Sequence, residues 1–219
     1  MAYEAAGNWR PLGPDDVVAD IHGFLEWVKG SPSHLADNFA YISANTDLLG
    51  WVVERVTGKS YATLVSELLW KPMRAGREGY VTLDRKGAPR CTGGIGATLR
   101  DFARVGHLVM EGGVCGGDRV VPEAWIDDIA DNQNGQAWKA GEWGSLFPYQ
   151  AMSYRGGWYV IDDEPRTLFA MGIHGQNLFV DRANRLVVAK FSSQVPRVDY
   201  PAWMLTHRAL PEFRRLLGC

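Results

Sequence analysis

The chain has few cysteines, and none of them follows a metal-binding pattern. Its three cysteines, Cys91, Cys115 and Cys219, are odd in number, and no C-x-x-C occurs. This spacing excludes a disulfide framework and a cysteine zinc site, and it is typical of a protein from a reducing compartment. We therefore expect neither a metal nor another cofactor. We expect a cytoplasmic location, since any export signal would lie upstream of this chain.

An excess of basic charge and long apolar runs are also lacking. The formal net charge is -2 and no basic run concentrates positive charge, which excludes the electrostatic signature of a nucleic-acid or anionic-membrane partner. No uncharged apolar stretch approaches a spanning length, and MAYEAAGNWRPLGPDD lacks the regions of a signal peptide. No repeat or linker divides residues 1–219, so we expect one partial domain.

The first part of the chain has helical periodicity. PDDVVADIHGFLEWVKG predicts a helix that begins near Pro14 and ends at Gly30. A second helix is predicted from a cap at Asn45, with Asp47 in its first turn, to Gly58. Its apolar spacing predicts a buried stripe of Leu48, Leu49, Val52, Val53 and Val56. Shorter helices are predicted over 61–70, after a capping-box-like Thr98-Leu-Arg-Asp101, and from Pro122.

From Trp158 onward the pattern changes to strands. GWYVIDD, RTLFAMGIHGQNLFVD and RLVVAKFSS are rich in β-branched and aromatic residues and are separated by turn residues. They predict successive antiparallel strands of one sheet. The tail, PAWMLTHRALPEFRRLLG, predicts a helix interrupted at Pro211 that lies across the sheet. The result is an α+β fold with a mainly helical part, 1–135, and a part with strands and a terminal helix, 136–219.

Two polar residues stand directly before the second predicted helix. Tyr41 and Ser43 are two residues apart in FAYISANTD. A tyrosine with an ordinary pKa near 10 becomes a base only if nearby cations favour the phenolate, so a catalytic Tyr41 would need a lysine close by. Ser43 could bind such a lysine or a substrate amide. The structural alternative is an aromatic anchor and a local hydrogen bond at a helix entrance.

The second candidate is GIHGQN, residues 172–177. Glycine is unfavourable in a strand unless a backbone or a ligand approaches closely, and Gly172 and Gly175 flank Ile173 and His174. This pattern predicts an edge strand that presents an N–H to a developing oxyanion, with His174 directed into a cleft. The alternative is a bulge with a histidine that faces solvent.

Taken in order, four motifs resemble one superfamily. YISANTDLLGWVVERVTG, CTGGIGATLRDFARVG, GGWY and GIHGQNLFVD are similar to the serine β-lactamase and penicillin-recognising superfamily, in its class C and D-alanyl carboxypeptidase branch. Within it, the chain is most similar to the aminohexanoate-dimer (nylon-oligomer) hydrolases and related esterases. The resemblance implies a β-lactamase-like α+β fold, in which an antiparallel sheet is flanked by helices and joined to a helical subdomain.

The resemblance also implies site residues. Tyr41 matches the tyrosine expected to relay the nucleophile's proton, Ser43 falls where many relatives have asparagine, and His174-Gly175-Gln176 matches a third element that usually carries lysine. The strand N–H near Ile173 would complete the oxyanion hole. Residues that the resemblance implies for substrate binding are Thr92, Trp158, Tyr159, Gly175 and Gln176. Thr92 replaces an asparagine of the nylon-oligomer hydrolases, so we expect a different specificity, and His174 in place of lysine favours an amidase or esterase.

The family's nucleophile motif is absent. None of the nine serines is followed by a lysine three residues later, and no G-x-S-x-G occurs. We expect these residues to be the C-terminal portion of a serine hydrolase for small amides or esters, truncated before the first strands and the S-x-x-K helix and inactive alone. Uncovered apolar faces would then favour association with the missing N-terminal half or with further copies. The alternatives are a degenerate ligand-binding member and a non-functional remnant.

Overall fold

The computed structural model describes residues 20–28, 38–132, 134–141, 143, 144, 147 and 151–218. In chain order the elements are α1 (Ile21–Val28), α2 (Ser43–Thr57), α3 (Tyr61–Val65), the π-helix η1 (Ser66–Trp70), β1 (Tyr80–Val81), β2 (Ile95–Gly96), α4 (Leu99–Met110), β3 (Val114–Cys115), β4 (Asp118–Arg119), α5 (Glu123–Asp131), α6 (Gly135–Ala140), β5 (Met152–Arg155), β6 (Trp158–Ile161), β7 (Thr167–Gly172), the 3-10 turn η2 (Ile173–Gly175), β8 (Gln176–Asp181), β9 (Leu186–Lys190) and α7 (Tyr200–Leu217). The predicted helix boundaries at Pro14 and Gly30 lie outside the described residues.

One antiparallel sheet of five strands forms the centre of the C-terminal part, in the order β5-β6-β7-β8-β9. Its register places Tyr159 opposite Phe169, Phe169 opposite Phe179, and Phe179 opposite Val188. The predicted α+β class and the predicted series of antiparallel strands are therefore confirmed. The division at residue 135 stays a prediction, since α4 packs on β8 and β9.

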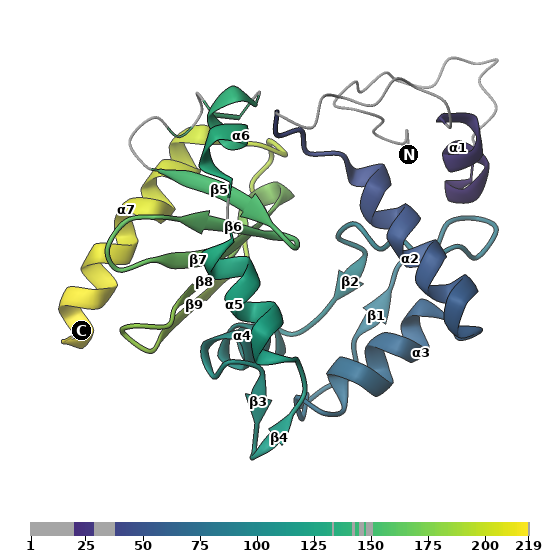
Figure 1. The fold of residues 1–219 in the computed structure, drawn as a ribbon, viewed down its shortest axis with the longest axis horizontal. Coiled ribbons are helices and arrows are strands. Elements are labelled where there is room, and N and C mark those ends of the chain that lie inside the picture. The colour runs from purple at the N-terminus through teal and green to yellow at the C-terminus, as the bar shows by residue number, and fades with distance from the viewer. Residues whose placement is uncertain are drawn as a thin grey trace.

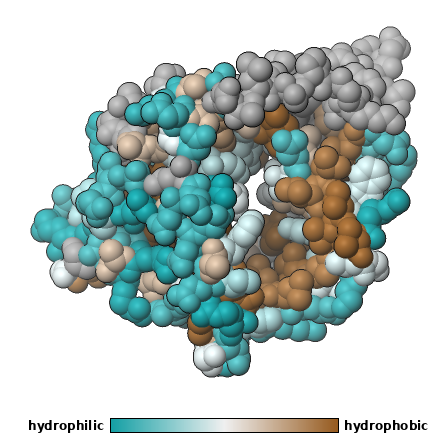
Figure 2. All heavy atoms as spheres, viewed as in Figure 1, coloured by the Kyte–Doolittle hydropathy of each residue, from teal (hydrophilic) through white to brown (hydrophobic). Residues whose placement is uncertain are grey.

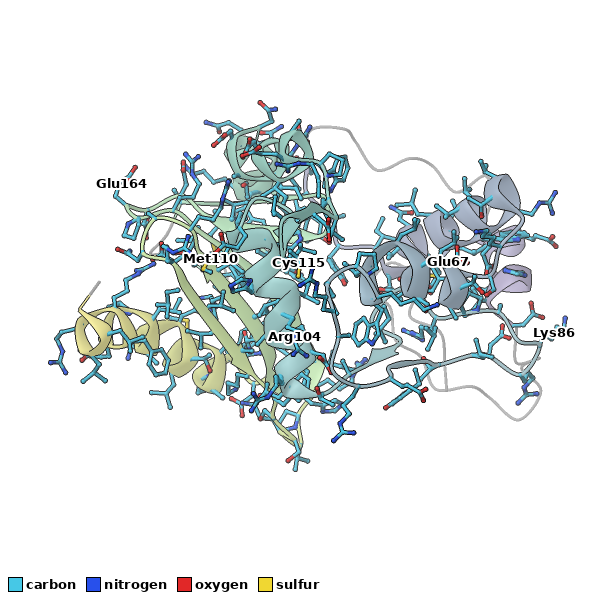
Figure 3. The ribbon with its side chains drawn as sticks, turned by 90° about the horizontal axis from the view of Figure 1, so that it is seen from below. Glu67, Lys86, Arg104, Met110, Cys115 and Glu164 are labelled. Atoms are coloured by element: carbon cyan, nitrogen blue, oxygen red, sulfur yellow. The ribbon has the colours of Figure 1, made fainter. Side chains whose placement is uncertain are left out.

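Helices cover both faces of this sheet (Figure 1). Side chains alternate between the faces along each strand: Phe169 and Phe179 pack toward Trp203 of α7, while Leu168 and Val180 pack toward Ile129 of α5. Figure 3 shows the helix that carries Arg104 and Met110, α4, on the side opposite α7. A Cβ atom on Gly106 would lie 2.6 Å from Val187 Cγ1, so glycine permits the close approach of α4.

Most local helix signals act as predicted. Thr98 Oγ1 accepts a hydrogen bond from the Asp101 N–H at the start of α4, and Gly58 ends α2 in the left-handed conformation with φ 69°. The predicted cap at Asn45 is wrong. Helix α2 begins at Ser43, and the Asn45 N–H already donates to Ile42 O. None of the described helices is long and apolar enough to span a membrane.

The predicted buried stripe of α2 is also wrong. Its five residues are between 42% and 80% exposed: Leu48, Leu49, Val52, Val53 and Val56. The buried residues of α2 are instead the small or polar Ala44, Asp47 and Gly50. Periodicity identifies a common face of a helix, but it does not say what covers that face. The expectation of uncovered apolar surface is therefore confirmed for α2.

Helix α7 runs without a break through Pro211, so the predicted interruption is wrong. A proline inside a helix removes one backbone hydrogen bond, and contacts on both sides of it hold α7 on the sheet. Trp203 and Leu210 lie in the buried core. Beyond the proline, Arg214 Nε donates to Asp181 Oδ2 of β8 over 2.6 Å. The predicted position across the sheet is confirmed.

A buried histidine on α7 leads to a pH prediction. His207 is 4% exposed, its ring packs edge-on against Phe169 and Phe179, and burial lowers its pKa from 6.5 to about 4. Between pH 6.5 and about 4, His207 of the unfolded chain binds a proton that His207 of the folded chain does not. The contribution of neutral His207 to the free energy of unfolding is therefore fully present above pH 6.5. It falls by up to roughly 3 kcal/mol as the pH drops toward 4.

We expect His207→Leu to flatten this part of the stability curve. The measurement is the urea unfolding free energy of both proteins between pH 7.5 and about 4. The exposed His107 provides the control, since His107→Gln should keep the slope of the parent chain. An unchanged slope in His207→Leu would contradict the assignment.

Candidate active site

Tyr41 lies in a cluster of aromatic rings. Its ring stacks on Trp143 with centroids 5.2 Å apart and meets Tyr154 edge-on at 6.0 Å. Trp143 in turn stacks on Tyr159. Burial, and secondly the neighbouring Tyr41, raise the pKa of Tyr154 to about 12, so this phenol stays neutral near neutral pH. The cluster holds the Tyr41 ring in one position directly before α2.

The segment before α2 is also held by its backbone. The Phe39 N–H donates to Ala137 O of α6 over 2.8 Å, and the chain then crosses from α6 to α2 (Figure 1). Ser43 is the first residue of α2 and is half-buried. Tyr41 and Ser43 therefore lie between the part of the molecule that contains the five-strand sheet and the part that contains α2.

Asp47 connects α2 to the segment that carries Thr92. This carboxylate is buried, and its Oδ1 accepts hydrogen bonds from the Cys91 N–H at 2.7 Å and the Thr92 N–H at 2.9 Å. From the sequence, Asp47 was expected only to place negative charge in the first turn of the helix. The link to Cys91 and Thr92 could not be predicted, because these residues are 44 and 45 positions away. Thr92 is thus placed relative to Ser43 by one side chain.

Cys91 has the environment of an unreactive thiol. It is half-buried, and burial, followed by the charges of Asp47 and Glu54, raises its pKa to about 12. The thiolate is the nucleophilic form of cysteine. A nucleophilic role for Cys91 is therefore not supported by its surroundings.

The GIHGQN segment forms a tight hairpin turn. Ile173–Gly175 is a 3-10 turn in which His174 has φ 60°, and it joins β7 to β8. Both strands lie inside the sheet, so the edge strand expected here is wrong, and so is the bulge. The predicted strand over 166–181 is two strands. Ile173 is 54% exposed, which leaves this part of the turn open to a ligand.

The turn is attached to the segment that follows β9. The His174 N–H donates to Arg197 O at 2.9 Å, and His174 O accepts from the Gln194 N–H at 3.3 Å. The side chain of Gln176 donates to Ser192 O at 2.6 Å and accepts from the Ser192 N–H at 3.1 Å. Both ends of the Gln176 amide are thus engaged within the protein.

Trp158 and Tyr159 lie on opposite faces of the sheet. Trp158 lines an apolar cavity of about 160 Å³ with residues of α4 and α5, while Tyr159 is buried among the rings on the α7 face, where it meets Tyr154 edge-on. Burial strongly raises the pKa of Tyr159. Adjacent strand residues point to opposite faces, so these two side chains do not form one wall of a cleft.

The structure brings the candidates together in two groups. Tyr41 and Ser43 stand at the start of α2, and Asp47 of α2 holds Thr92. Ile173, His174 and Gly175 form the turn at one end of the sheet, and Gln176 begins β8 there. The strand register places this turn at the end where β5 stops and β6 begins. Figure 2 shows the molecule hollowed between the sheet part and the α2 part. Within the described ranges, no three His, Cys, Asp or Glu side chains could hold a metal ion.

Known proteins match this chain over most of its length. A sequence model described as Beta-lactamase matches residues 26–210. A 6-aminohexanoate-dimer hydrolase from Paenarthrobacter ureafaciens is 36% identical over 203 residues, which are 93% of this chain and 50% of that protein. The chain therefore spans about half the length of this curated relative.

This chain also matches solved structures over about half of their length. A Bacillus anthracis protein proposed to be a 6-aminohexanoate-dimer hydrolase matches with a TM-score of 0.79 and 25% identity, over 90% of this chain and 49% of that one. An octameric penicillin-binding protein homologue from Pyrococcus abyssi matches with a TM-score of 0.64 and 16% identity, over 96% and 49%. The second likeness concerns the fold alone.

Proposed function

Because the chain belongs to the Beta-lactamase family, we propose that it forms part of a serine hydrolase that cleaves small amides or esters through an acyl-enzyme. The observation that carries the proposal is the position of the Tyr41-x-Ser43 element. It lies at the entrance of α2, fixed by the rings of Trp143 and Tyr154. A proton-transfer group needs such a fixed position, because its efficiency depends on hydrogen-bond reach to the reacting atom.

The proposed roles follow from chemistry and position. Tyr41 takes the proton of the nucleophile and returns it to the leaving group, while Ser43 orients the nucleophile or the substrate amide. The Ile173 N–H donates to the oxyanion of the tetrahedral intermediate. His174 and Thr92 contact the substrate. Residues proposed to support these groups rather than touch the substrate are Trp158, Tyr159, Gly175 and Gln176.

The nucleophile is proposed to come from outside the 219 residues. No Ser-x-x-Lys occurs in the sequence, and the matched relatives are about twice as long as this chain. A lysine beside Tyr41 would also come from the polypeptide that supplies the nucleophile. Its ammonium would favour the Tyr41 phenolate by charge. The proposed active site therefore forms between this chain and a nucleophile-bearing polypeptide.

The exposed stripe of α2 supports this arrangement. Leu48, Leu49, Val52, Val53 and Val56 form one apolar face of the helix that Ser43 begins, and Figure 2 shows hydrophobic residues over α2 beside the hollow. Monomeric soluble proteins rarely expose a contiguous apolar face of this kind. We propose that the nucleophile-bearing polypeptide covers it.

Complementation tests the proposal. The probe is the half of the Paenarthrobacter ureafaciens hydrolase that this chain does not match, mixed with the full chain and assayed with p-nitrophenyl esters and mass spectrometry. We expect no turnover by the chain alone, and turnover with an acylated serine on the supplied half in the mixture. Turnover by the chain alone would contradict an external nucleophile. Binding of an uncleaved ester without acylation would favour a ligand-binding protein.

We expect polar substitutions in the stripe to weaken both self-association and complementation. Leu49→Gln with Val56→Gln removes apolar area from the proposed interface, so the concentration of partner needed for half-maximal activity should rise at least tenfold. The measurement is a titration of ester hydrolysis, with sedimentation velocity of the chain alone. Leu205→Gln, an exposed position on α7, should change neither value. Equal effects at both places would contradict the interface.

A further inference from the structure

A segment that begins at the last residue of β9 wraps around the His174 turn. It runs from Lys190 to Arg197, and we call it the 190–197 segment. The Lys190 ammonium donates to Gly175 O at 3.1 Å, and the segment also holds the His174 backbone and the Gln176 side chain through the bonds described above. Gly175 has φ 83°, a conformation that residues with a Cβ atom rarely adopt, and a Cβ atom there would lie 2.5 Å from Gln194 Oε1, so glycine favours this close approach. The turn and the segment form one unit.

The segment also contacts the imidazole ring of His174. Nδ1 lies 2.8 Å from Gln194 O. A carbonyl oxygen carries no proton and can only accept, so Nδ1 must be the donor in this bond. A neutral imidazole has one N–H, and the other ring nitrogen is then an acceptor. Nε2 of neutral His174 therefore carries a lone pair, and no hydrogen-bond partner of Nε2 is found in the part of the chain that the structure describes.

We propose that the 190–197 segment fixes His174 in the Nδ1–H tautomer, so that its Nε2 accepts a hydrogen bond from a donor group of the substrate. The tautomer assignment does not depend on the proposed function, and only the identification of the ligand as a substrate rests on it. A lysine at this position would offer three donors, a positive charge and no acceptor, which suits a carboxylate. An unprotonated Nε2 suits an amide N–H, a hydroxyl or an ammonium group, and its lone pair repels a carboxylate oxygen.

Gln176 is the positioning residue in this unit. Its amide has one acceptor and one donor group, and these pair with the N–H and the carbonyl of Ser192. Ser192 lies two residues before Gln194, whose carbonyl accepts from His174. Loss of both Gln176 bonds should loosen the segment around Ser192 and Gln194 and so let the ring exchange tautomers. Gln176 thus acts through His174 and does not need to contact the substrate.

The first test is ¹⁵N NMR of the full chain labelled at histidine, at pH 8, where histidines of ordinary pKa are neutral. The His174 signals are assigned by their loss in His174→Gln. We expect a protonated, pyrrole-type Nδ1 and an unprotonated, pyridine-type Nε2. In Gln176→Leu the two shifts should move toward a common average, while Ser193→Ala, an exposed neighbour in the same segment, should leave them unchanged. A pyrrole-type Nε2 in the parent chain would overturn the assignment.

The second test separates the ligand classes. Hexanamide and hexanoate have the same chain length and differ in offering N–H donors or a carboxylate. We expect hexanamide to shift the His174 Nε2 signal at concentrations at least tenfold below those at which hexanoate does. A preference for hexanoate, or no shift with either probe, would overturn the proposed role in substrate recognition. Neither readout requires turnover, so failure of complementation alone would count against the proposed hydrolase and not against the tautomer.

Discussion

Replacement of Tyr41 by phenylalanine should lower kcat/KM of the complemented hydrolase by about 10²- to 10⁴-fold, the usual contribution of a positioned acid–base group. The substitution removes only the hydroxyl. The ring keeps its stacking on Trp143 and its edge-on contact with Tyr154, so the aromatic cluster should remain intact. The loss would then report proton transfer. It is measured as ester hydrolysis with the supplied half at saturating concentration.

Tyr61→Phe provides the matched control. Tyr61 is a half-buried phenol on α3, and burial raises its pKa to about 12, but it lies outside the Tyr41 cluster. Its variant should keep kcat/KM within about twofold of the parent value. The urea unfolding free energy of Tyr41→Phe should change by no more than about 1 kcal/mol. Full activity of Tyr41→Phe, or equal losses in both variants, would rule out the proposed role.

Replacement of Arg214 by methionine should lower the free energy of unfolding by about 3 to 5 kcal/mol, the typical result of breaking one partner of a buried ion pair. The Arg214 guanidinium donates to Asp181 Oδ2 at 2.6 Å and to Thr167 Oγ1 at 2.7 Å. The Asp181 side chain is 3% exposed. In the variant this carboxylate stays buried with hydrogen bonds from Asn184 alone among the contacts described, and it loses its counter-charge.

The next residue supplies the control. Arg215 forms an exposed ion pair with Glu212 one helical turn away, and such pairs contribute little. Arg215→Met should therefore change the unfolding free energy by less than about 0.5 kcal/mol. The double variant Arg214→Met with Asp181→Leu should recover part of the loss, because no uncompensated buried charge remains. A loss below about 1 kcal/mol in Arg214→Met would contradict the buried pair.

Much of the fold could be predicted because its signals are local. Gly58 and Thr98 mark helix boundaries through their own backbone and side-chain chemistry. The opposite orientations of Trp158 and Tyr159 also follow from strand alternation, although the family resemblance implied that both line one cleft. The turn at Ile173–Gly175 was missed, because two short strands joined by a tight turn resemble one long apolar run.

The rest of the candidate site depends on contacts between distant residues. Trp143 and Tyr154 surround Tyr41 across more than 100 residues of sequence, and no local pattern connects them. The bond from His174 Nδ1 to Gln194 O has the same character, since its acceptor is a backbone carbonyl that any residue could supply. Such positions become visible only when the chain is folded.

The amino-acid sequence by itself determined the α+β class, the antiparallel strands after Trp158, the motifs of the Beta-lactamase family and the absence of Ser-x-x-Lys, because each depends on residue types at short spacing. Only the tertiary structure decided three further properties. It left the apolar face of α2 exposed, it linked Asp47 to Thr92, and it set the tautomer of His174. The physical reason is that burial, hydrogen bonding and charge depend on neighbours that the folded chain brings together.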